Sequence, residues 1–404
     1  MILSERHRDF FVPKEEIERR VRAFQSILRA MDLSSAWIDH LTDRCYFSGS
    51  IQNGILLIPA EGQPLYFVKK SVARAESESP LEVLPYPGRK GLLKKIAESV
   101  GSKGRLGLSM DVTPASTYEW LRSILAEDRM VDISLSVRLQ KAVKSGWEVA
   151  QITKAVEQAD MLFREMKDHF RTGMTELELS AAIEGRLRGL GHAGTLRIRH
   201  PGSDLPIVNV VSGESALYPT NFDGPAGGEG PFPSSPSGAG WKPIVEGEML
   251  IVDMVTSYNG YYADHTRAYY VGRSVPETAK NAHDFCLGVI NRLEGSLRPG
   301  RDCGGLYEEI QNWADKQGVP EGFMGYGENR VRFFGHGVGL ELDEFPIIAK
   351  KIDVIFKSGM VVAVEPKAFL EGIGPVGVEN TYLVTETGCQ RLCTAEQNIV
   401  PLID

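Results

Sequence analysis

Cysteine is scarce in this sequence, and the five that occur, at positions 45, 286, 303, 389 and 393, follow no regular spacing. An odd count without a framework argues against a disulfide-stapled fold and is typical of reduced thiols in the cytosol. Cys389 and Cys393 offer half of a soft-metal site, but no second pair accompanies them. We therefore expect buried thiols with a structural role.

Long apolar runs and basic tracts are also missing. No stretch approaches the ~18 apolar residues of a membrane span, and the start of the chain lacks the apolar core of a signal peptide. The net charge is -8, and no basic tract is available to neutralise phosphates. We therefore expect a cytoplasmic protein that uses neither a membrane nor a nucleic acid as its partner.

What is present is ordinary for a soluble globular enzyme: 404 residues, 42% hydrophobic and 24% charged, enough for two domains. Residues 14–32 have the apolar spacing of an amphipathic helix. Short strand-like runs follow at 36–38, 45–47, 54–59 and 64–68, and helical patterns at 89–100 and 116–125. We predict a small α/β domain over residues 1–137 and a larger domain over residues 138–404.

The larger domain opens with helical patterns at 145–170 and 175–190, the second behind a Thr-Glu-Leu-Glu cap-like sequence, and has two more at 277–297 and 306–317. The chain changes character over residues 192–242, where a strand-like run at 207–211 is followed by a stretch dense in Gly, Pro and Ser at 215–241. This composition suits a flexible surface loop. However, Tyr218, Phe222, Phe232 and Trp241 would be costly to leave in water, which favours an ordered loop that walls a pocket.

The stretch over residues 249–267, MLIVDMVTSYNGYYADHTR, predicts a β-hairpin. Asn259-Gly260 between two runs rich in Ile, Val, Thr and Tyr is a strong signal for a two-residue turn. With Tyr258 opposite Tyr261, Asp253 and Asp264 become diagonal neighbours on one face, roughly 7–8 Å apart at the backbone. Two carboxylates so close in an apolar ribbon repel each other unless a cation lies between them. The hairpin therefore predicts a metal site, the alternative being two solvated charges.

Three further stretches carry polar residues where a strand should want Val or Ile. His336 lies between glycines in FGHGVGL, Glu365 ends the apolar run MVVAVEP, and Glu379 is embedded in GPVGVENTYLV. The order Asp, Asp, His, Glu, Glu, each in its local setting, resembles the pita-bread metallopeptidases, which include Xaa-Pro aminopeptidase, prolidase, methionine aminopeptidase and the non-peptidase creatinase. The resemblance covers about residues 145–400, with a looser likeness before them.

This resemblance implies an α+β protein with a carboxy-terminal pita-bread fold and an amino-terminal creatinase-type domain, assembled as a homodimer. It also implies a dinuclear site. Asp264 and Glu379 would bridge two divalent ions, Asp253 would complete one ion, and His336 and Glu365 the other. Four carboxylates and one imidazole suit Mn, Co, Fe or Zn, and Glu365 is the candidate to take the proton of a bridging water.

Three departures from the family pattern stand out. Asp343 replaces a second histidine after the His336 motif. Tyr218 or Thr220 stands where an upstream loop histidine is expected, and Gly377 replaces an arginine. Asp343 is then either a replacement acid or base or a surface residue beside Glu344.

Anionic substrate groups have candidate partners in Arg197 and Arg199, or in His200, although exposed strand charges explain these residues equally well. His265 adjoins a ligand but points to the other strand face, so we expect it to pack. The function predicted first is hydrolysis of short peptides with proline after the scissile bond. A non-peptidase, such as a lyase that uses Asp343 as its base, is the alternative, and a binding protein on an inactive peptidase scaffold is the third.

Overall fold

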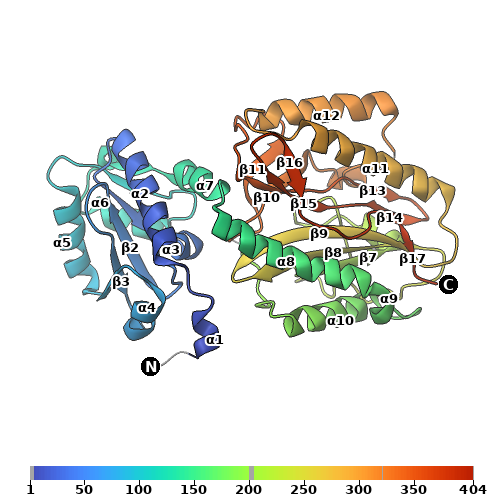
Figure 1. Ribbon diagram of the computed structural model, residues 1–404, viewed down its shortest axis with the longest axis horizontal. Helices are drawn as coiled ribbons and strands as arrows, with labels where there is room; N and C mark the ends of the chain where they lie inside the picture. The colour runs from blue at the N-terminus through green and yellow to red at the C-terminus, as the bar shows by residue number, and fades with distance from the viewer. Residues whose placement is uncertain (1–3, 200–203, 321, 404) are drawn as a thin grey trace. The chain divides into compact units, whose positions relative to one another are not determined.

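The computed structural model describes residues 4–199, 204–320 and 322–403, and the chain divides into two compact units, Met1–Lys141 and Ala142–Asp404. Figure 1 follows the chain through both units. Within the described residues, none of the helices combines the length and hydropathy that crossing a bilayer requires. The five cysteines are free thiols.

The first unit is built on a six-stranded sheet in the order β4-β3-β2-β1-β5-β6. The central pairs β1/β2 and β2/β3 are antiparallel, and the outer pairs are parallel. Apolar side chains of α5, including Leu92 and Ile96, pack with Leu106 and Leu108 of β5 in its core. The elements are α1 (Glu5–Arg8), α2 (Lys14–Ala30), β1 (Ser35–Ile38), α3 (Leu41–Ser48), β2 (Gly54–Pro59), β3 (Leu65–Val68), α4 (Val72–Glu78), β4 (Glu82–Pro85), α5 (Gly88–Val100), β5 (Leu106–Leu108), α6 (Ala115–Arg122), η1 (Glu127–Arg129), β6 (Met130–Asp132) and α7 (Ser134–Ala142).

One strand predicted in this unit is wrong, because residues 45–47 lie in helix α3. The run Cys45-Tyr46-Phe47 is too short for its periodicity to separate a strand from a buried helix. The wider pattern is helical, since Thr42 and Asp43 are buried on the same side as Tyr46 and Phe47. Gly49 then ends the helix in the left-handed conformation.

The second unit contains two larger sheets and one two-stranded ribbon. A four-stranded sheet has the order β17-β9-β8-β7, a five-stranded sheet has the order β11-β10-β12-β15-β16, and β13 pairs with β14. The strands are β7 (Val208–Ser212), β8 (Met249–Tyr258), β9 (Tyr261–Tyr270), β10 (Phe333–Gly337), β11 (Glu344–Ala349), β12 (Val361–Val364), β13 (Lys367–Leu370), β14 (Gly374–Gly377), β15 (Asn380–Val384), β16 (Cys389–Arg391) and β17 (Val400–Pro401).

Helices cover the strands of this unit on two sides (Figure 1). Helices α8 and α10 pack against β7, β8 and β9, while α11 packs on β13 and β14 and α12 on β11. Capping boxes at Ser145 and Thr175 open α8 and α10, which confirms the cap predicted at Thr175. The helices are α8 (Gly146–Arg164), α9 (Met166–His169), α10 (Glu176–Gly189), η2 (Gly213–Leu217), α11 (Glu277–Ser296), α12 (Cys303–Gln317) and η3 (Gly327–Asn329).

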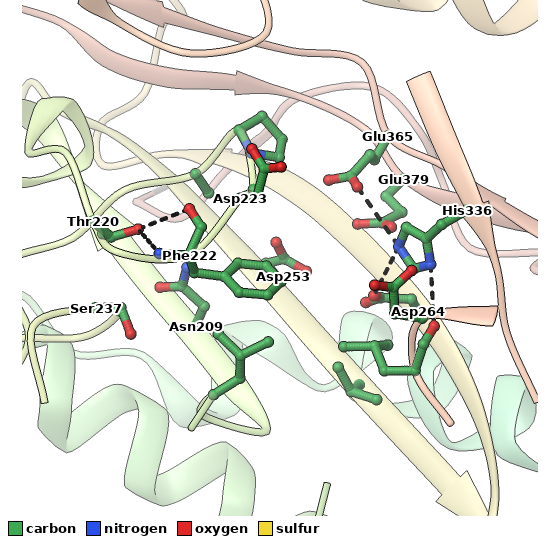
Figure 2. A pocket seen from close by; sticks show the side chains of 18 of the residues that line it. Asn209, Thr220, Phe222, Asp223, Ser237, Asp253, Asp264, His336, Glu365 and Glu379 are labelled. Carbon is green, nitrogen blue, oxygen red and sulfur yellow. Dashed lines mark hydrogen bonds and ion pairs between the residues drawn. The ribbon is translucent and has the colours of Figure 1, made fainter. Parts of the chain in front are cut away.

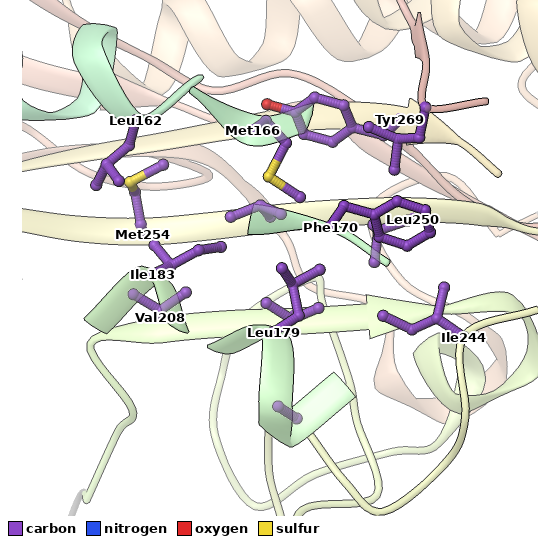
Figure 3. Close-up of a cluster of buried hydrophobic side chains, with 14 of the residues drawn as sticks. Leu162, Met166, Phe170, Leu179, Ile183, Val208, Ile244, Leu250, Met254 and Tyr269 are labelled. Carbon is purple, nitrogen blue, oxygen red and sulfur yellow. The ribbon is translucent and has the colours of Figure 1, made fainter. Parts of the chain in front are cut away.

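A buried apolar cluster fixes α8 and α10 to the four-stranded sheet (Figure 3). Leu162 of α8 and Leu179 and Ile183 of α10 pack with Val208 of β7 and Met254 of β8. All five side chains are at most 2% exposed. Truncating such a leucine to alanine costs about 2–5 kcal/mol, so this cluster holds the outer face of the sheet rigid while the other face is free to build a site.

Candidate metal centre and cavity

The hairpin of β8 and β9 forms in the register that the sequence predicts. Tyr258 is opposite Tyr261, Asp253 opposite Thr266, and Val255 opposite Asp264. Both turn residues, Asn259 and Gly260, have positive φ, at 50° and 81°, as the turn type that suits a twisted two-residue hairpin requires. Asp253 and Asp264 therefore face the same cavity.

The second sheet supplies the other three polar residues. His336 lies on β10, Glu365 directly follows β12, and Glu379 directly precedes β15. These strands are neighbours in the order β10-β12-β15, so their ends meet. Glu379 also exchanges backbone hydrogen bonds with Thr266 of β9, at 3.1 and 3.4 Å. This bridge joins the two sheets where the five side chains converge.

Asp264, His336 and Glu379 form a group whose ligand atoms all lie within 4.8 Å of one another. His336 Nε2 is 3.8 Å from Asp264 Oδ2 and 3.7 Å from Glu365 Oε1 (Figure 2). Its Nδ1 is 3.1 Å from the carbonyl oxygen of Leu342, which can only accept a hydrogen bond. In the neutral imidazole Nδ1 therefore carries the proton, which leaves the lone pair on Nε2, the nitrogen that faces the acids, as in histidines that bind metals.

Two carboxylate oxygens in this group lack a protein partner. Asp264 Oδ1 and Glu379 Oε1 are buried and accept no hydrogen bond from the described residues. Buried acceptors are nearly always satisfied, and an unpaired buried charge is expensive. The geometry and chemistry of Asp264, His336 and Glu379 therefore fit a divalent cation.

Lys367 is a cation that the sequence analysis missed. Its side chain is fully buried, and its Nζ lies 2.6 Å from Glu365 Oε2, 3.0 Å from Glu379 Oε2 and 3.3 Å from Asp253 Oδ2. The ammonium thus stands among three of the five residues expected to hold two ions. The donor set fits one ion beside His336 and does not fit a second ion beside Asp253.

Charge and burial act together on this cluster. Burial raises the pKa of Asp264 well above its usual value, and the charges of Glu379, Asp253 and Glu365 raise it further. Burial lowers the pKa of Lys367, but Asp253, Glu365 and Glu379 outweigh it, so the net pKa is raised and the ammonium stays charged. The acids of this cluster therefore need positive charge to remain ionised, and Lys367 supplies part of it.

A cavity of about 240 Å³ opens onto the acids. Its far wall comes from the Gly- and Pro-rich segment, through Thr220, Phe222 and Asp223, together with Asn209 of β7 (Figure 2). Apolar side chains such as Phe333 complete the lining. The prediction that this segment is ordered and walls a pocket is confirmed for its described residues, and the cavity suits a small, partly apolar ligand.

The remaining residues predicted for the site fall in different places. Asp343 lines the cavity, and its charge is among those that raise the pKa of His336 against the opposing effect of burial. Thr220 lines the cavity too, whereas Tyr218 is 52% exposed and is not part of the described lining. His200 lies outside the described residues.

The two arginines proposed for substrate binding are also outside the described lining. Arg199 is buried, with its Nη1 3.8 Å from Glu341 Oε2. The backbone carbonyl of Arg197 accepts a hydrogen bond from Leu342 N at 2.9 Å. Both residues thus contact the loop that joins His336 to Asp343, through Glu341 and Leu342, and do not line the described cavity. His265 is fully buried, as expected for a packing residue.

The expectation that burial would order the aromatic residues of the Gly- and Pro-rich segment was wrong for three of them. Tyr218, Phe232 and Trp241 are 52%, 57% and 57% exposed. Only Phe222 turns into the cavity. Phe232 and Trp241 instead contact each other edge to face, with ring centroids 6.4 Å apart. Hydrophobicity alone did not reveal this, because single exposed aromatics are common on protein surfaces.

A signal for Lys367 was nevertheless present in the sequence. Lysine is rare within a fully apolar strand run, and VAVEPKAFL places it two residues after Glu365, on the same face of an extended chain. Its strand partner is Gly377. A Cβ at position 377 would lie 2.7 Å from Lys367 Cα and 3.0 Å from its Cγ, so the arginine expected at 377 has no room beside this lysine. Asp223 had no comparable signal.

Comparisons with known proteins agree with this architecture. The profile of Metallopeptidase family M24 matches residues 150–386, and that of the Creatinase/Prolidase N-terminal domain matches residues 20–143. The chain is 25% identical to the Xaa-Pro dipeptidase of Pyrococcus furiosus over 393 residues, which cover 96% of this chain and all of the relative. It is also 25% identical to an uncharacterized peptidase of Bacillus subtilis, over 80% of this chain and 82% of that protein.

Solved structures show the same fold. The prolidase of Pyrococcus horikoshii OT3 superimposes with a TM-score of 0.76 at 23% identity, over 95% of this chain and 100% of its own. The Xaa-Pro dipeptidase of Bacillus anthracis gives a TM-score of 0.78 at 21% identity, over 95% and 99%.

Fold and site together define a pita-bread metallohydrolase that carries a creatinase-type amino-terminal domain. The chain belongs to metallopeptidase family M24, and within it is an Xaa-Pro peptidase-like hydrolase. The fold class predicted from the five-residue pattern is thereby confirmed.

Proposed function

We propose that this protein hydrolyses short peptides in which proline follows the scissile bond. The observation that carries the proposal is the convergence of Asp264, His336 and Glu379 on the floor of a cavity of about 240 Å³. Full-length similarity to an Xaa-Pro dipeptidase supports the substrate class. The cavity volume and its mixed lining suit a dipeptide or tripeptide better than a folded protein.

Each side chain has a role in this proposal. Asp264, His336 and Glu379 would hold a divalent ion, which when bound supplies Lewis acidity and lowers the pKa of water. Glu365 is the proton acceptor, because its Oε1 faces His336 while Lys367 fixes its Oε2. Asp343, on the lining beside His336, is positioned to handle a proton on the substrate side. Phe222 and Phe333 exclude water from the bound peptide.

Metal identity, assembly and location belong to the same proposal. Carboxylate and imidazole ligands suit manganese, with cobalt, iron and zinc as the other candidates. We expect a homodimer in the cytoplasm. Metal analysis of the purified protein and its mass in solution test the first two points.

The decisive test loads the chelator-treated protein with each of the four metals and incubates it with Xaa-Pro dipeptides and tripeptides. We expect release of the amino-terminal amino acid, detected by mass spectrometry, and at least a 100-fold loss of rate in Asp264→Asn. Peptides with alanine in place of proline serve as the substrate control. No release with any of the four metals would reject the proposal.

A second candidate, elimination or another non-peptidase reaction, is favoured by one observation. An aspartate rather than a histidine faces the cavity beside His336, so the pocket has a carboxylate base where the peptidases have an imidazole. In either reaction Asp343→Asn should lower kcat by about 100-fold or more, as loss of a general acid or base does. The exposed Asp353→Asn is the matched control. Unchanged turnover in Asp343→Asn would leave Asp343 without a catalytic role.

A further inference from the structure

The cluster of acids around the candidate metal site already contains one cation, the ammonium of Lys367. We propose that the Lys367 ammonium stands in for one of the two metal ions expected of this family, so that the chain binds a single divalent ion at Asp264, His336 and Glu379. The inference concerns the cation content of the site and does not depend on which substrate is used.

The carboxylate oxygens divide into two groups, and this division carries the argument. Glu365 Oε2, Glu379 Oε2 and Asp253 Oδ2 all lie within 3.3 Å of Lys367 Nζ. On the other side, Glu365 Oε1 and Asp264 Oδ2 lie 3.7 and 3.8 Å from His336 Nε2, too far for direct hydrogen bonds. Glu379 thus gives one oxygen to the ammonium and keeps Oε1 without a partner in the described part of the chain.

An ion beside Asp253 would have to share these oxygens with the ammonium. A divalent ion needs carboxylate oxygens at about 2.0–2.2 Å, and the oxygens of Asp253, Glu365 and Glu379 that face inward already surround Nζ. Lys367 is fully buried, so its ammonium has no solvent to move into. Repulsion between two cations in this low-dielectric pocket would then oppose a second ion.

Charge balance points the same way. The four acids, Asp253, Asp264, Glu365 and Glu379, carry four negative charges when all are ionised. Lys367 and one divalent ion together supply three positive charges, leaving one negative charge for a proton or the substrate to balance. Two divalent ions with Lys367 would supply five positive charges, so that site would be neutral only with an additional bound anion, whereas one ion needs none.

The backbone around Lys367 is built for this side chain. Lys367 and Gly377 are direct partners in the β13/β14 ribbon. Gly377 has a φ of 138°, and a side chain there would meet Pro366 O at 2.5 Å and Lys367 Cγ at 3.0 Å. The glycine therefore leaves the space through which the lysine reaches the acids. Glycine at 377 and lysine at 367 are therefore sterically complementary, whereas an arginine at 377 would not fit opposite this lysine.

Metal stoichiometry tests the proposal without reference to activity. Full-length protein is stripped with a chelator, titrated with Mn²⁺, and examined by native mass spectrometry and electron paramagnetic resonance. We expect one equivalent in the wild type, with the six-line spectrum of an isolated ion. In Lys367→Ala, we expect a second equivalent and an exchange-coupled spectrum of paired ions.

Lys141→Ala is the matched control, because Lys141 is another buried lysine, 3.2 Å from Asp43 in the first unit. It should bind one equivalent. Two tightly bound Mn²⁺ ions in the wild type would overturn the proposal, whatever the fate of Lys367→Ala, so the test survives a variant that fails to fold. One equivalent in a folded Lys367→Ala would also overturn it.

Discussion

Two other buried lysines of this protein, each within reach of an acid, provide a comparison for Lys367. Lys141 lies 3.2 Å from Asp43, and Lys144 lies 3.0 Å from Glu344. Lys367 lies within 3.3 Å of three acids. A buried one-to-one pair is close to electrically neutral and usually structural, whereas one lysine among several carboxylates leaves negative charge in place, which is the electrostatic requirement for binding a further cation.

Sequence reasoning found the site residues that carry a pattern. Asp253 and Asp264 followed from the hairpin register, while His336, Glu365 and Glu379 stood out as polar residues in apolar runs, and all five line the same cavity. The role assigned to Tyr218 rested on its place where a loop histidine is expected, and the roles assigned to Arg197 and Arg199 rested on residue type. Neither argument fixes where a loop turns its side chains, which is why the sequence did not predict where these three lie.

His192 makes stability depend on pH. It is buried, its Nδ1 accepts a hydrogen bond from Gly194 N at 2.9 Å, and its Nε2 donates one to Val255 O at 3.2 Å. Burial lowers its pKa below the ordinary 6.5. The unfolded chain therefore takes up a proton at a higher pH than the folded chain. Neutral His192 makes its full contribution to stability above pH 6.5, and this contribution is lost as the pH falls below that value.

We expect the melting temperature to fall between about pH 7 and pH 5, and His192→Gln to make that fall shallower. In His192→Gln the melting temperature should still fall somewhat with pH, because burial also lowers the pKa of His283. The partly exposed His7→Gln is the control. Thermal unfolding across this pH range checks the prediction, and equal slopes in wild type and His192→Gln would contradict it.

At the level of elements, α10 anchors the loop that walls the cavity. Glu176, the first residue of α10, accepts hydrogen bonds from Ser212 N at 2.7 Å, from Ser212 Oγ at 3.0 Å and from Gly240 N at 3.2 Å. It also accepts one from Ser215 Oγ. One buried carboxylate thus ties both ends of the segment that carries Thr220, Phe222 and Asp223 into the cavity.

Replacing Glu176 with alanine should loosen this wall. The backbone N–H of Gly240 would lose its acceptor and that of Ser212 its shorter one, so we expect a loss of about 2 kcal/mol or more in the free energy of unfolding. KM should rise more than kcat falls. Glu178→Ala, which removes the neighbouring exposed cap residue of the same turn, should cost less and leave KM unchanged. Urea unfolding and steady-state kinetics measure both effects, and an unchanged KM in Glu176→Ala would refute the anchoring role.

Element prediction succeeded where periodicity was long and failed where it was short. The hairpin and the capped helix α10 combine extended patterns with turn or cap residues, and both form as predicted. The helix predicted over residues 145–170 begins as expected behind its cap, but α8 ends at Arg164 and a separate short helix, α9, follows at Met166–His169. The three residues 45–47 contained too little pattern to distinguish a helix from a strand. The exposed aromatics of the Gly- and Pro-rich segment show that composition does not determine loop conformation.

At the level of the whole molecule, each unit has its own hydrophobic core. Leu106 and Leu108 belong to the core of the first unit, and Leu162 and Leu179 to a core of the second. The candidate metal ligands all lie in the second unit. Ligand binding stabilises only the part that binds, by about 2.7 kcal/mol when the ligand is at 100 times its Kd.

Calorimetry should therefore show two transitions with separate responses. Adding Mn²⁺ should raise the melting temperature of residues 142–404 and leave the melting temperature of the first unit unchanged. Leu106→Ala, a fully buried core residue, should destabilise the first unit by about 2–5 kcal/mol and leave the metal-dependent transition unchanged. A single transition that moves with both changes would argue that the units unfold together.

The lysine beneath the acids also bears on how the protein matures. Buried carboxylates without any positive charge nearby repel one another. A protein with such a pocket cannot complete its folding until it binds a metal ion. In this protein the ammonium of Lys367 provides one positive charge as soon as the chain is synthesised. Newly made protein should therefore reach its final backbone in a metal-starved cell and become active later, by drawing an ion from the labile pool.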